Sequence, residues 1–305
     1  MSLSPAGAHG GDAHRLAQRL GRDRRDILDL SASLNPIAPD CRPILRAALD
    51  ELDHYPDDAR ATEALAEAMG VDAARLVLTN GGAEAIALVA RRHPAGWADQ
   101  FDFSLYRRHL EIPDPNGPLW RSDPHNPTGR LLDPDDHRAS VRDEAFYLLA
   151  TGAWTRGDPG VPVVGSLTKA WALPGLRIGY ALCPSAEEAE LLRLLRPQWS
   201  VNGLVCAALP AVLELADPAG WRDGIADLRA QLVDVLRRHD LEPTPSDVNY
   251  VWVPDAAGLR DLLLPEGVLL RDGTSFGHPD AVRIAVPDAD GLARLSDTLD
   301  RLRPR

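Results

Sequence analysis

The most constraining feature of this sequence is the segment of residues 161–180, VPVVGSLTKAWALPGLRIGY, which contains the only lysine of the chain, Lys169. The chain has 33 lysine and arginine side chains, so every other one of them is arginine. Arginine stays protonated, whereas a desolvated lysine can lose its proton and attack a carbonyl group. We therefore expect Lys169 where a guanidinium group cannot substitute, close behind a short buried strand, VPVV.

Side chains on both sides of Lys169 suit a phosphate group. Ser166 lies three residues before the lysine and Arg177 eight residues after it, which supplies a hydroxyl donor and a fixed cation. Gly175 and Gly179 would let the backbone pass close to a ligand. An amine beside a phosphate-binding pair predicts a Schiff-base lysine, most often one that binds pyridoxal phosphate.

Two alternatives remain open for this segment. A lysine without further context is more often a solvated surface residue than a catalytic one. The spacing S-x-x-K, with Ser166 as the nucleophile, also occurs in serine hydrolases that carry a second lysine in a K-T-G element. Because the chain has no second lysine, the hydrolase is the weaker alternative.

The composition is that of an ordinary globular protein and excludes several classes. A length of 305 residues suggests about two domains. The net charge of −12 argues against a nucleic-acid partner, and neither a transmembrane run nor an apolar signal core is present. Cys41, Cys183 and Cys206 are scattered without a C-x-x-C pair, which predicts reduced thiols, no metal site and a cytoplasmic location.

The first part of the chain alternates helices with turns. The expected elements are helices over residues 13–20, 41–52 and 59–69, and a strand, glycine turn and helix over residues 76–92. Gly82 stands at the start of the last helix, where free N–H groups and the helix dipole favour a phosphate. Because the glycines do not form G-x-G-x-x-G, we do not expect a dinucleotide site.

The middle of the chain has the weakest pattern. Residues 93–122 carry aromatics and prolines but no clean strand, and residues 123–136 predict a turn-rich loop that includes Asn126 in N-P-T-G. A strand is expected over residues 141–149, and it would bury Asp143. A buried carboxylate needs a partner, either a protonated pyridine nitrogen or an arginine.

The C-terminal part predicts a second, smaller α+β domain. The expected elements are helices over residues 185–195, 199–215 and 221–238, a strand over 247–254, a short helix over 256–263, strands over 267–273 and 281–287, and a helix over 289–302. Arg271 and Arg283 lie in the last two strands. An arginine near a strand end suits a bidentate contact with a carboxylate or a phosphate.

The order of the motifs points to a family. A glycine turn, N-P-T-G, D-E-A-F, S-x-x-K and P-G-L-R follow one another over nearly the whole chain. This order resembles the fold-type I pyridoxal-phosphate enzymes of aminotransferase class I/II, which include histidinol-phosphate aminotransferase. H-G-G-D, L-S-A-S-L-N-P, H-Y-P-D, D-E-A-F and A-L-P-G-L-R-I-G-Y look more narrowly like the threonine-phosphate decarboxylases of cobalamin biosynthesis.

The resemblance implies an α/β fold with a mixed, mostly parallel sheet flanked by helices. The implied parts are an N-terminal segment, residues 1–40, that packs on the small domain and the active site, a large domain, residues 41–205, and a small domain, residues 206–305. The resemblance also implies a homodimer, in which Tyr55 reaches the cofactor phosphate of the neighbouring subunit.

The resemblance further implies a role for single residues. Lys169 would form the Schiff base and move protons at Cα, and Asp143 would keep the pyridine nitrogen protonated. Asn126 would hydrogen-bond the ring oxygen O3′, and Phe103 would stack on the ring. The cofactor phosphate would be bound by Gly82, Ala83, Ser166, Arg177 and Tyr55. The substrate would be bound at its carboxylate by Arg283 and at its own phosphate or carboxylate by His9, Asn35 and Arg271.

The sequence departs from the family pattern at two places. Phe146 stands where many of these aminotransferases have a tyrosine that donates to O3′, which fits the decarboxylase-like subgroup. Residues 93–142 are fewer than the family usually has, and the strands before Phe103 and Asn126 look eroded.

The narrower resemblance leads us to expect a decarboxylase of a small phosphorylated amino acid. The alternatives are an aminotransferase of the histidinol-phosphate type and a protein whose catalysis is lost or weakened.

Overall fold

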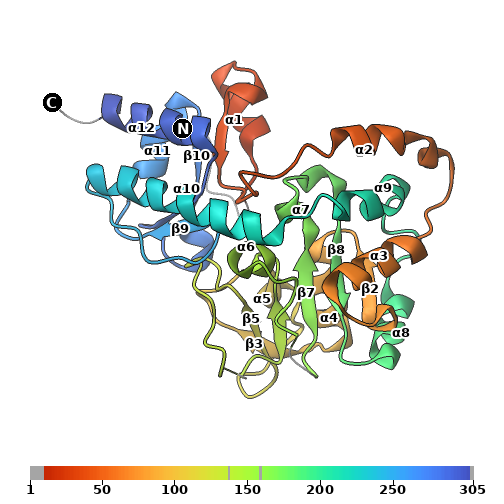
Figure 1. Ribbon diagram of the computed structural model, residues 1–305. Coiled ribbons are helices and arrows are strands. Elements are labelled where there is room, and N and C mark those ends of the chain that lie inside the picture. The colour runs from red at the N-terminus through yellow and green to blue at the C-terminus, as the bar shows by residue number, and fades with distance from the viewer. Residues whose placement is uncertain (1–9, 137, 158–159, 303–305) are drawn as a thin grey trace.

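The protein folds around two β-sheets whose helices lie against the sheet faces (Figure 1). The computed structural model describes residues 10–136, 138–157 and 160–302. The larger sheet lies in the lower half of Figure 1, and the smaller sheet lies at the upper left beside α1 and α12.

The larger sheet is a 7-stranded mixed sheet in the order β2-β8-β7-β6-β5-β3-β4. From β7 to β4 all neighbouring strands run parallel, whereas β8 is antiparallel to β7 and to β2. The strands are β2 (Leu76–Thr79), β3 (Ala95–Ala98), β4 (Ile112–Pro113), β5 (Leu119–Ser122), β6 (Val141–Asp143), β7 (Val163–Ser166) and β8 (Gly179–Leu182). This arrangement confirms the expected mixed, mostly parallel α/β architecture.

Helices cover both faces of the larger sheet, so that even β2 at its edge and β8 beside it are buried on both sides. The helices are α1 (Ala13–Leu20), α2 (Arg42–Ala47), α3 (Ala59–Met69), α4 (Gly82–Arg92), α5 (Leu105–His109), α6 (Tyr147–Thr151), α7 (Leu167–Ala170), α8 (Ala186–Leu195), α9 (Gly203–Leu213), α10 (Pro218–Arg238), α11 (Leu259–Leu263) and α12 (Ala289–Leu302). α4, α5 and α8 pack on one face, and α3, α6 and α9 pack on the other.

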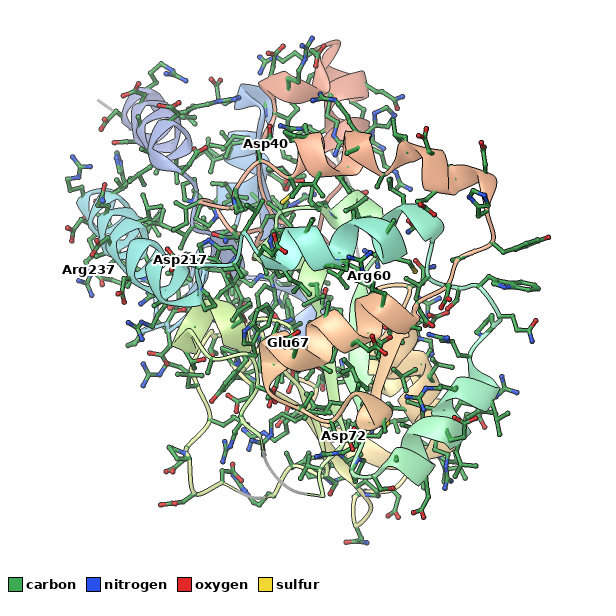
Figure 2. All side chains as sticks on the ribbon, turned by 45° about the vertical axis from the view of Figure 1, so that its right-hand side comes forward. Asp40, Arg60, Glu67, Asp72, Asp217 and Arg237 are labelled. Atoms are coloured by element: carbon green, nitrogen blue, oxygen red, sulfur yellow. The ribbon has the colours of Figure 1, made fainter. Side chains whose placement is uncertain are left out.

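Helix α3 shows how the sequence pattern sets this packing. Its buried residues include Ala61, Leu65 and Met69, which recur every four residues and therefore lie on one side of the helix. Figure 2 shows α3 beside α9, with Arg60 and Glu67 on α3, and both of these charged residues are exposed. The helix ends at Gly70, as expected, because that glycine adopts the left-handed conformation of a helix C-cap.

The smaller sheet has four strands in the order β1-β10-β11-β9. They are β1 (Leu28–Leu30), β9 (Tyr250–Val253), β10 (Val268–Asp272) and β11 (Val282–Ala285). β1 pairs in parallel with β10, so the N-terminal segment and the C-terminal strands share one sheet. The chain therefore returns to its own beginning and can build one site from both ends.

The long helix α10 connects a larger body, built around the larger sheet, to a smaller body, built around the smaller sheet (Figure 1). Trp221 and Ile225 near its start pack in the core of the larger body, and Leu232 and Leu236 pack in the core of the smaller one. The boundary expected after residue 205 falls inside α9, whose buried residues belong to the larger core. We propose that the division between the two bodies lies within α10 instead.

No described helix is by itself long and apolar enough to cross a membrane. By length and composition, only α9 and α10 taken together pass that test among the described residues, as a pair bent by 87°.

The stretch of residues 93–142 is more regular than its sequence predicts. It contains β3, α5 and β5, so the expectation that it has no clean strand is wrong. The strands before Phe103 and Asn126 are present, although each has only 4 residues. Strands of this length give only a weak pattern, although β5 buries every second residue, Trp120 and Ser122.

Two other boundaries differ from the expectation. The strand expected over residues 141–149 ends at Asp143, and the chain continues as α6 from Tyr147. The helix expected from residue 199 begins at Gly203, because the side chain of Asn202 caps it by accepting from the Val205 N–H.

The connection from β5 to β6 contains no helix in its described residues, although parallel neighbours are usually joined by one. It is instead fixed by side chains. Arg121 Nη1 lies 2.6 Å from Asp136 Oδ2, and the Leu132 N–H donates to Asp123 Oδ1 at 3.0 Å. These bonds hold residues 123–136 against the sheet.

Candidate active site

A cavity of about 750 Å³ opens at the carboxyl ends of the parallel strands. Ser122, Asp143 and Ser166, which are the last residues of β5, β6 and β7, line it. Residues of the N-terminal segment and the small sheet complete its wall. In open α/β sheets ligands bind at this end of the strands. The cavity is therefore the place to look for the predicted site residues.

Lys169 lies in the short helix α7, directly after β7, and faces the cavity. Its Nζ stands 5.9 Å from the ring centre of Phe146. Burial, reinforced by the nearby guanidinium group of Arg283, lowers the pKa of Lys169 to about 8. A fraction of the amine is therefore unprotonated near neutral pH, which a nucleophilic or proton-moving lysine needs.

A cradle of glycines and one arginine lies at the start of α4. The first N–H groups of a helix, here those of Gly82 and Ala83, have no partner within the helix. A Cβ atom at Gly81 would come within 2.4 Å of Arg177 Nη2, and a Cβ atom at Gly179 within 2.4 Å of the Gly82 nitrogen. Only glycine fits at these two positions. The absence of a Cβ atom there lets the guanidinium group and the helix N-terminus approach the same point.

Ser166 and Arg177 are both held at this cradle. Ser166 Oγ lies 2.8 Å from Thr168 Oγ1. Arg177 has a left-handed backbone, with φ of 55°, and donates from Nη1 to the Pro174 carbonyl oxygen at 3.0 Å. A left-handed backbone at a non-glycine residue costs free energy, so the surrounding structure holds Arg177 in this conformation.

Asp143 ends β6 on the floor of the cavity. Its Oδ2 accepts from Tyr106 Oη at 2.8 Å, and its Oδ1 accepts from the Ala145 N–H at 2.9 Å. Burial raises the pKa of Asp143 to about 6, and the two hydrogen bonds oppose that rise. A buried carboxylate with fixed orientation is suited to hold a cationic ring nitrogen.

Asn126 connects the loop after β5 to the small sheet. Its Oδ1 accepts from Arg283 Nη1 at 2.6 Å, and its backbone N–H donates to Ser122 Oγ at 2.7 Å. Ser122 Oγ in turn donates to Asp102 Oδ1 at 2.5 Å. Because Oδ1 is occupied by the arginine, the amide NH₂ of Asn126 is the end left to donate to a ligand.

Arg271 and Arg283 lie directly opposite each other on the antiparallel pair β10 and β11. Both side chains are buried and line the cavity. Burial and the neighbouring Arg283 lower the pKa of Arg271 to about 10, and burial also lowers the pKa of Arg283. Two buried cations side by side favour an anionic ligand between them and Lys169. Phe103 lines the same cavity and contacts Tyr106 edge-on.

Two predicted residues, Tyr55 and Asn35, do not line this cavity. Tyr55 is 79% exposed and stacks against Trp199, with ring centres 4.6 Å apart. Asn35 is buried, but its Nδ2 donates to the Ala170 carbonyl oxygen at 2.8 Å and its Oδ1 accepts from the Ile37 N–H. These bonds give Asn35 a structural role, and its contact with a substrate stays a prediction. His9 lies outside the described residues.

Sequence reasoning missed two buried residues that contact the cavity lining, Tyr106 and Asp102, and two residues of the lining itself. Tyr106 lies in the same D-F-S-L-Y motif as Phe103, one helical turn later, and that spacing is the signal that could have revealed it. Asp102 is the first residue of that motif. An aspartate beside a short helix is a common turn residue, so its type did not indicate that it would be buried. Arg24 and Asp29 line the cavity from the N-terminal segment. Asp29 is held there by Ser31, whose N–H and hydroxyl both donate to its Oδ1.

The described residues fit pyridoxal phosphate. The glycine cradle leaves space that a Cβ would fill, beside unpaired helix N–H groups and a guanidinium group. Among the described residues that line the cavity, Asp143 supplies a carboxylate and Lys169 supplies an amine whose pKa is lowered. A phosphate, a cationic ring nitrogen and an aldehyde therefore each have a matching group in this one cavity.

The comparisons with known proteins agree with this fit. The family model of "Aminotransferase class I and II" matches residues 98–299. A histidinol-phosphate aminotransferase of Thiobacillus denitrificans is 31% identical, over 93% of this chain and 87% of that protein. A second such enzyme, of Methylococcus capsulatus, is 27% identical over 99% of this chain and 98% of that protein. That alignment runs over 368 positions, so the relative carries insertions that this 305-residue chain lacks.

Solved structures show the same fold. The histidinol-phosphate aminotransferase of Sinorhizobium meliloti, solved in complex with pyridoxal 5′-phosphate, has a TM-score of 0.79 at 18% identity and covers 95% of this chain and 94% of that chain. The threonine-phosphate decarboxylase of Porphyromonas gingivalis has a TM-score of 0.77 at 23% identity, over 90% of this chain and 99% of that chain.

These comparisons favour a pyridoxal-phosphate enzyme over the S-x-x-K hydrolase. The matched span covers the loop of Asn126, the strand of Asp143 and the helix of Lys169. The chain therefore belongs to the class I and II aminotransferase family of pyridoxal-phosphate-dependent enzymes.

Proposed function

We propose that the protein is an aminotransferase of the histidinol-phosphate type, which transfers an amino group from a small amine carrying an anionic group to a 2-oxo acid. The observation that carries this proposal is the position of Arg271 and Arg283, paired on adjacent strands and facing the same cavity as Lys169. The names of the relatives support transamination better than the decarboxylation that the sequence motifs favour.

Residues of the larger body would hold the cofactor. Ser166, Arg177 and the N–H groups of Gly82 and Ala83 would bind its phosphate, since they converge at the start of α4. Asp143 would bind the ring nitrogen, Asn126 would donate to the ring oxygen, and Phe103 would cover the ring face. When bound, pyridoxal phosphate supplies an electron-withdrawing ring that weakens the bonds at the substrate's α-carbon.

Lys169 would serve both as the cofactor's covalent anchor and as the base at the α-carbon. An amine whose pKa is about 8 can accept a proton and return it near neutral pH without a large energetic penalty. Arg283 would orient the substrate for this transfer. Its guanidinium group is fixed by Asn126 Oδ1, by the Ser31 carbonyl oxygen and by the ring of Tyr250, 4.7 Å away.

The paired arginines favour a doubly charged substrate. A phosphate monoester carries about −1.5 to −2 charges at neutral pH, and a dicarboxylate carries two. Either would offset the repulsion between Arg271 and Arg283, which adds to burial in lowering the pKa of Arg271. Histidinol phosphate as the amino donor and a dicarboxylic 2-oxo acid as the acceptor both meet this requirement, so one pair of cations would serve both half-reactions.

We also propose that the enzyme is a homodimer in which Tyr55 acts on the partner's site. Tyr55 and Trp199 are the two most protruding aromatics of the larger body, 79% and 56% exposed, and they stack on each other. An exposed aromatic pair is typical of a surface that a second protein covers. The position of Tyr55 outside its own cavity is consistent with a role in the neighbouring one.

Decarboxylation of threonine phosphate is the second candidate, and one observation favours it. Phe146 provides no hydroxyl beside Lys169, as expected for the decarboxylase-like subgroup. The fold of the Porphyromonas decarboxylase is shared, but a likeness at 23% identity indicates only the fold. The two reactions differ in which bond at the α-carbon is broken, and the arginines that clamp the substrate decide that orientation.

The test is to load the protein with pyridoxal phosphate and to offer histidinol phosphate with 2-oxoglutarate, and threonine phosphate alone. We expect glutamate from the first mixture and no CO₂ from the second. Release of CO₂ without glutamate would favour the decarboxylase. Cofactor binding without either product would favour the protein with lost catalysis. As a check on the carrying observation, Arg283→Lys should raise KM strongly, because lysine cannot reproduce the bidentate contact.

A further inference from the structure

We infer that Tyr106 is a positioning residue for the reaction and that it acts through Asp143. The inference rests on the proposed role of Asp143 at the cofactor's ring nitrogen. Tyr106 Oη donates to Asp143 Oδ2 at 2.8 Å, and both side chains are buried. Tyr106 belongs to α5, in the stretch of residues 93–142, whereas Asp143 ends β6, so the bond ties the shortened stretch to the centre of the site.

The carboxylate of Asp143 needs such a donor if it is to hold the ring nitrogen of the cofactor. A charged partner for a ring nitrogen has to be ionised and held in one orientation. Oδ1 already accepts from the Ala145 N–H, and the hydroxyl of Tyr106 fixes Oδ2 from the other side. Hydrogen bonds to the ionised form favour that form, and they oppose the rise in pKa that burial causes at Asp143.

A second buried carboxylate makes this support more important. Asp102 is 1% exposed, and the two carboxylates repel each other, which further raises the pKa of Asp143. Asp102 itself is bonded to Ser122 and to the Phe103 N–H. Lys169 is the nearby cation that opposes the repulsion. Without the Tyr106 hydroxyl, repulsion and burial would both favour a protonated, neutral Asp143.

The surroundings of Tyr106 make it a reliable donor. Burial and the adjacent carboxylates raise the pKa of its hydroxyl well above the usual value, so the hydroxyl stays protonated. Its ring packs against Trp120 and Phe103, with ring centres 5.8 Å and 5.7 Å away. Tyr106→Phe therefore retains the packing of the ring and removes only the hydroxyl.

The test measures the affinity of the cofactor-free protein for pyridoxal phosphate between pH 6 and pH 8.5, by equilibrium dialysis. For Tyr106→Phe we expect an affinity about tenfold below that of the wild type near pH 6 and a difference of about threefold or less at pH 8.5. The reason is that losing the donor raises the pKa of Asp143, and the deficit in ionised Asp143 is largest at low pH. The acid limb of the pH profile of kcat should move to higher pH in the same direction.

Tyr180→Phe is the matched control. Tyr180 is a buried tyrosine on β8, and no hydrogen bond to Asp143 is found for it in the described residues. We expect its affinity to follow the wild-type pH curve. Thermal unfolding of both cofactor-free variants shows whether they remain folded. An equal loss at every pH in Tyr106→Phe, or an equal loss in Tyr180→Phe, would overturn the inference. A wild-type protein that binds no pyridoxal phosphate would instead refute the proposed function.

Discussion

Two neighbouring parts of one sheet contribute to the site in different ways. Residues 161–182, which we call the lysine segment, form β7, α7 and β8 and carry Ser166, Lys169 and Arg177 within twelve positions. Residues 93–142, the shortened stretch, form β3, α5 and β5 and carry residues whose partners lie elsewhere, such as Tyr106 with Asp143. The lysine segment holds the reactive groups, whereas the shortened stretch holds them in place.

The difference shows that the order of the strands is kept even where the described part of a connection contains no helix. The loop from β5 to β6 contains no helix in its described residues, yet β5 and β6 still pair in register, with Ser122 beside Asp143. Side-chain bonds, rather than a packed helix, can therefore hold a connection between parallel strands in place. The following predictions separate the contributions of the two parts.

The largest effect is expected from the lysine segment. Lys169→Arg keeps the positive charge but removes the only side-chain amine of the chain. We expect the transamination rate to fall by a factor on the order of 10⁴ or more, because both the covalent anchor and the base are lost. Rates are measured with saturating cofactor and substrate. A variant that retains a tenth of the activity would show that Lys169 is not the catalytic amine.

A smaller effect is expected from the shortened stretch. Asn126→Ala removes the acceptor of Arg283 and the proposed donor to the ring oxygen. We expect kcat/KM to fall by about 10²-fold, the usual cost of one preorganised donor. Asn116→Ala is the control, since its side chain is not in the cavity and its backbone N–H alone bonds Asp114. Equal losses in both variants would indicate a general destabilisation of the stretch.

The pH dependence of cofactor attachment reports directly on the lysine segment. Because the pKa of Lys169 is lowered to about 8, its free-amine fraction rises as the pH rises through 8 and changes little above about pH 9. We expect the attachment rate, followed by the visible absorbance of the bound cofactor, to rise by about fiftyfold from pH 6 to pH 8. A rate that still climbs about sevenfold between pH 9 and pH 10 would indicate an ordinary, solvated lysine.

Much of the lysine segment was predictable because its functional residues are close in sequence. The spacing of Ser166, Lys169 and Arg177 is local, and the strand, turn and helix that bring them together are contiguous. The elements of the C-terminal part were predictable for the same reason, since their apolar periodicity is local. The contacts that complete the site are not of this kind.

The partners in the shortened stretch could not be predicted because they meet across the sheet. Arg283 and Asn126 are 157 positions apart, and Tyr106 and Asp143 are 37 positions apart. Nothing in the composition around Asp102 indicates that it will be buried beside another carboxylate. The strands β3 and β5 were missed because each has only 4 residues, which is too few for a clear alternating pattern.

The glycines test how tightly the cradle is built. Gly179→Ala would place a Cβ within 2.4 Å of the Gly82 nitrogen and 2.5 Å of the Gly81 carbonyl carbon. We expect a loss of about 1–3 kcal/mol in the free energy of unfolding and a weaker affinity for pyridoxal phosphate. Gly175→Ala is the control for stability, because nothing lies within 4 Å of its added Cβ. An unchanged unfolding midpoint in Gly179→Ala would mean that the cradle is loose.

The smallest effect is expected at the loop between β5 and β6. Asp136→Asn weakens the contacts with Arg121 and Arg138, which lie 2.6 Å and 2.8 Å away. We expect a loss of about 1 kcal/mol in unfolding free energy and an almost unchanged kcat, since the loop supports the sheet from outside the cavity. Unfolding in urea and steady-state kinetics measure the two quantities. A large loss of kcat would show that this loop shapes the site itself.

The most direct test of the central claim is to load the protein with pyridoxal phosphate, reduce it with borohydride and map the modified peptide. Because the chain has a single lysine, only Lys169 and the α-amino group can be labelled. The account predicts a visible absorbance band that disappears on reduction and a pyridoxyl group on Lys169. A colourless protein, or label on the α-amino group alone, would contradict the assignment of Lys169 and the mechanism built on it.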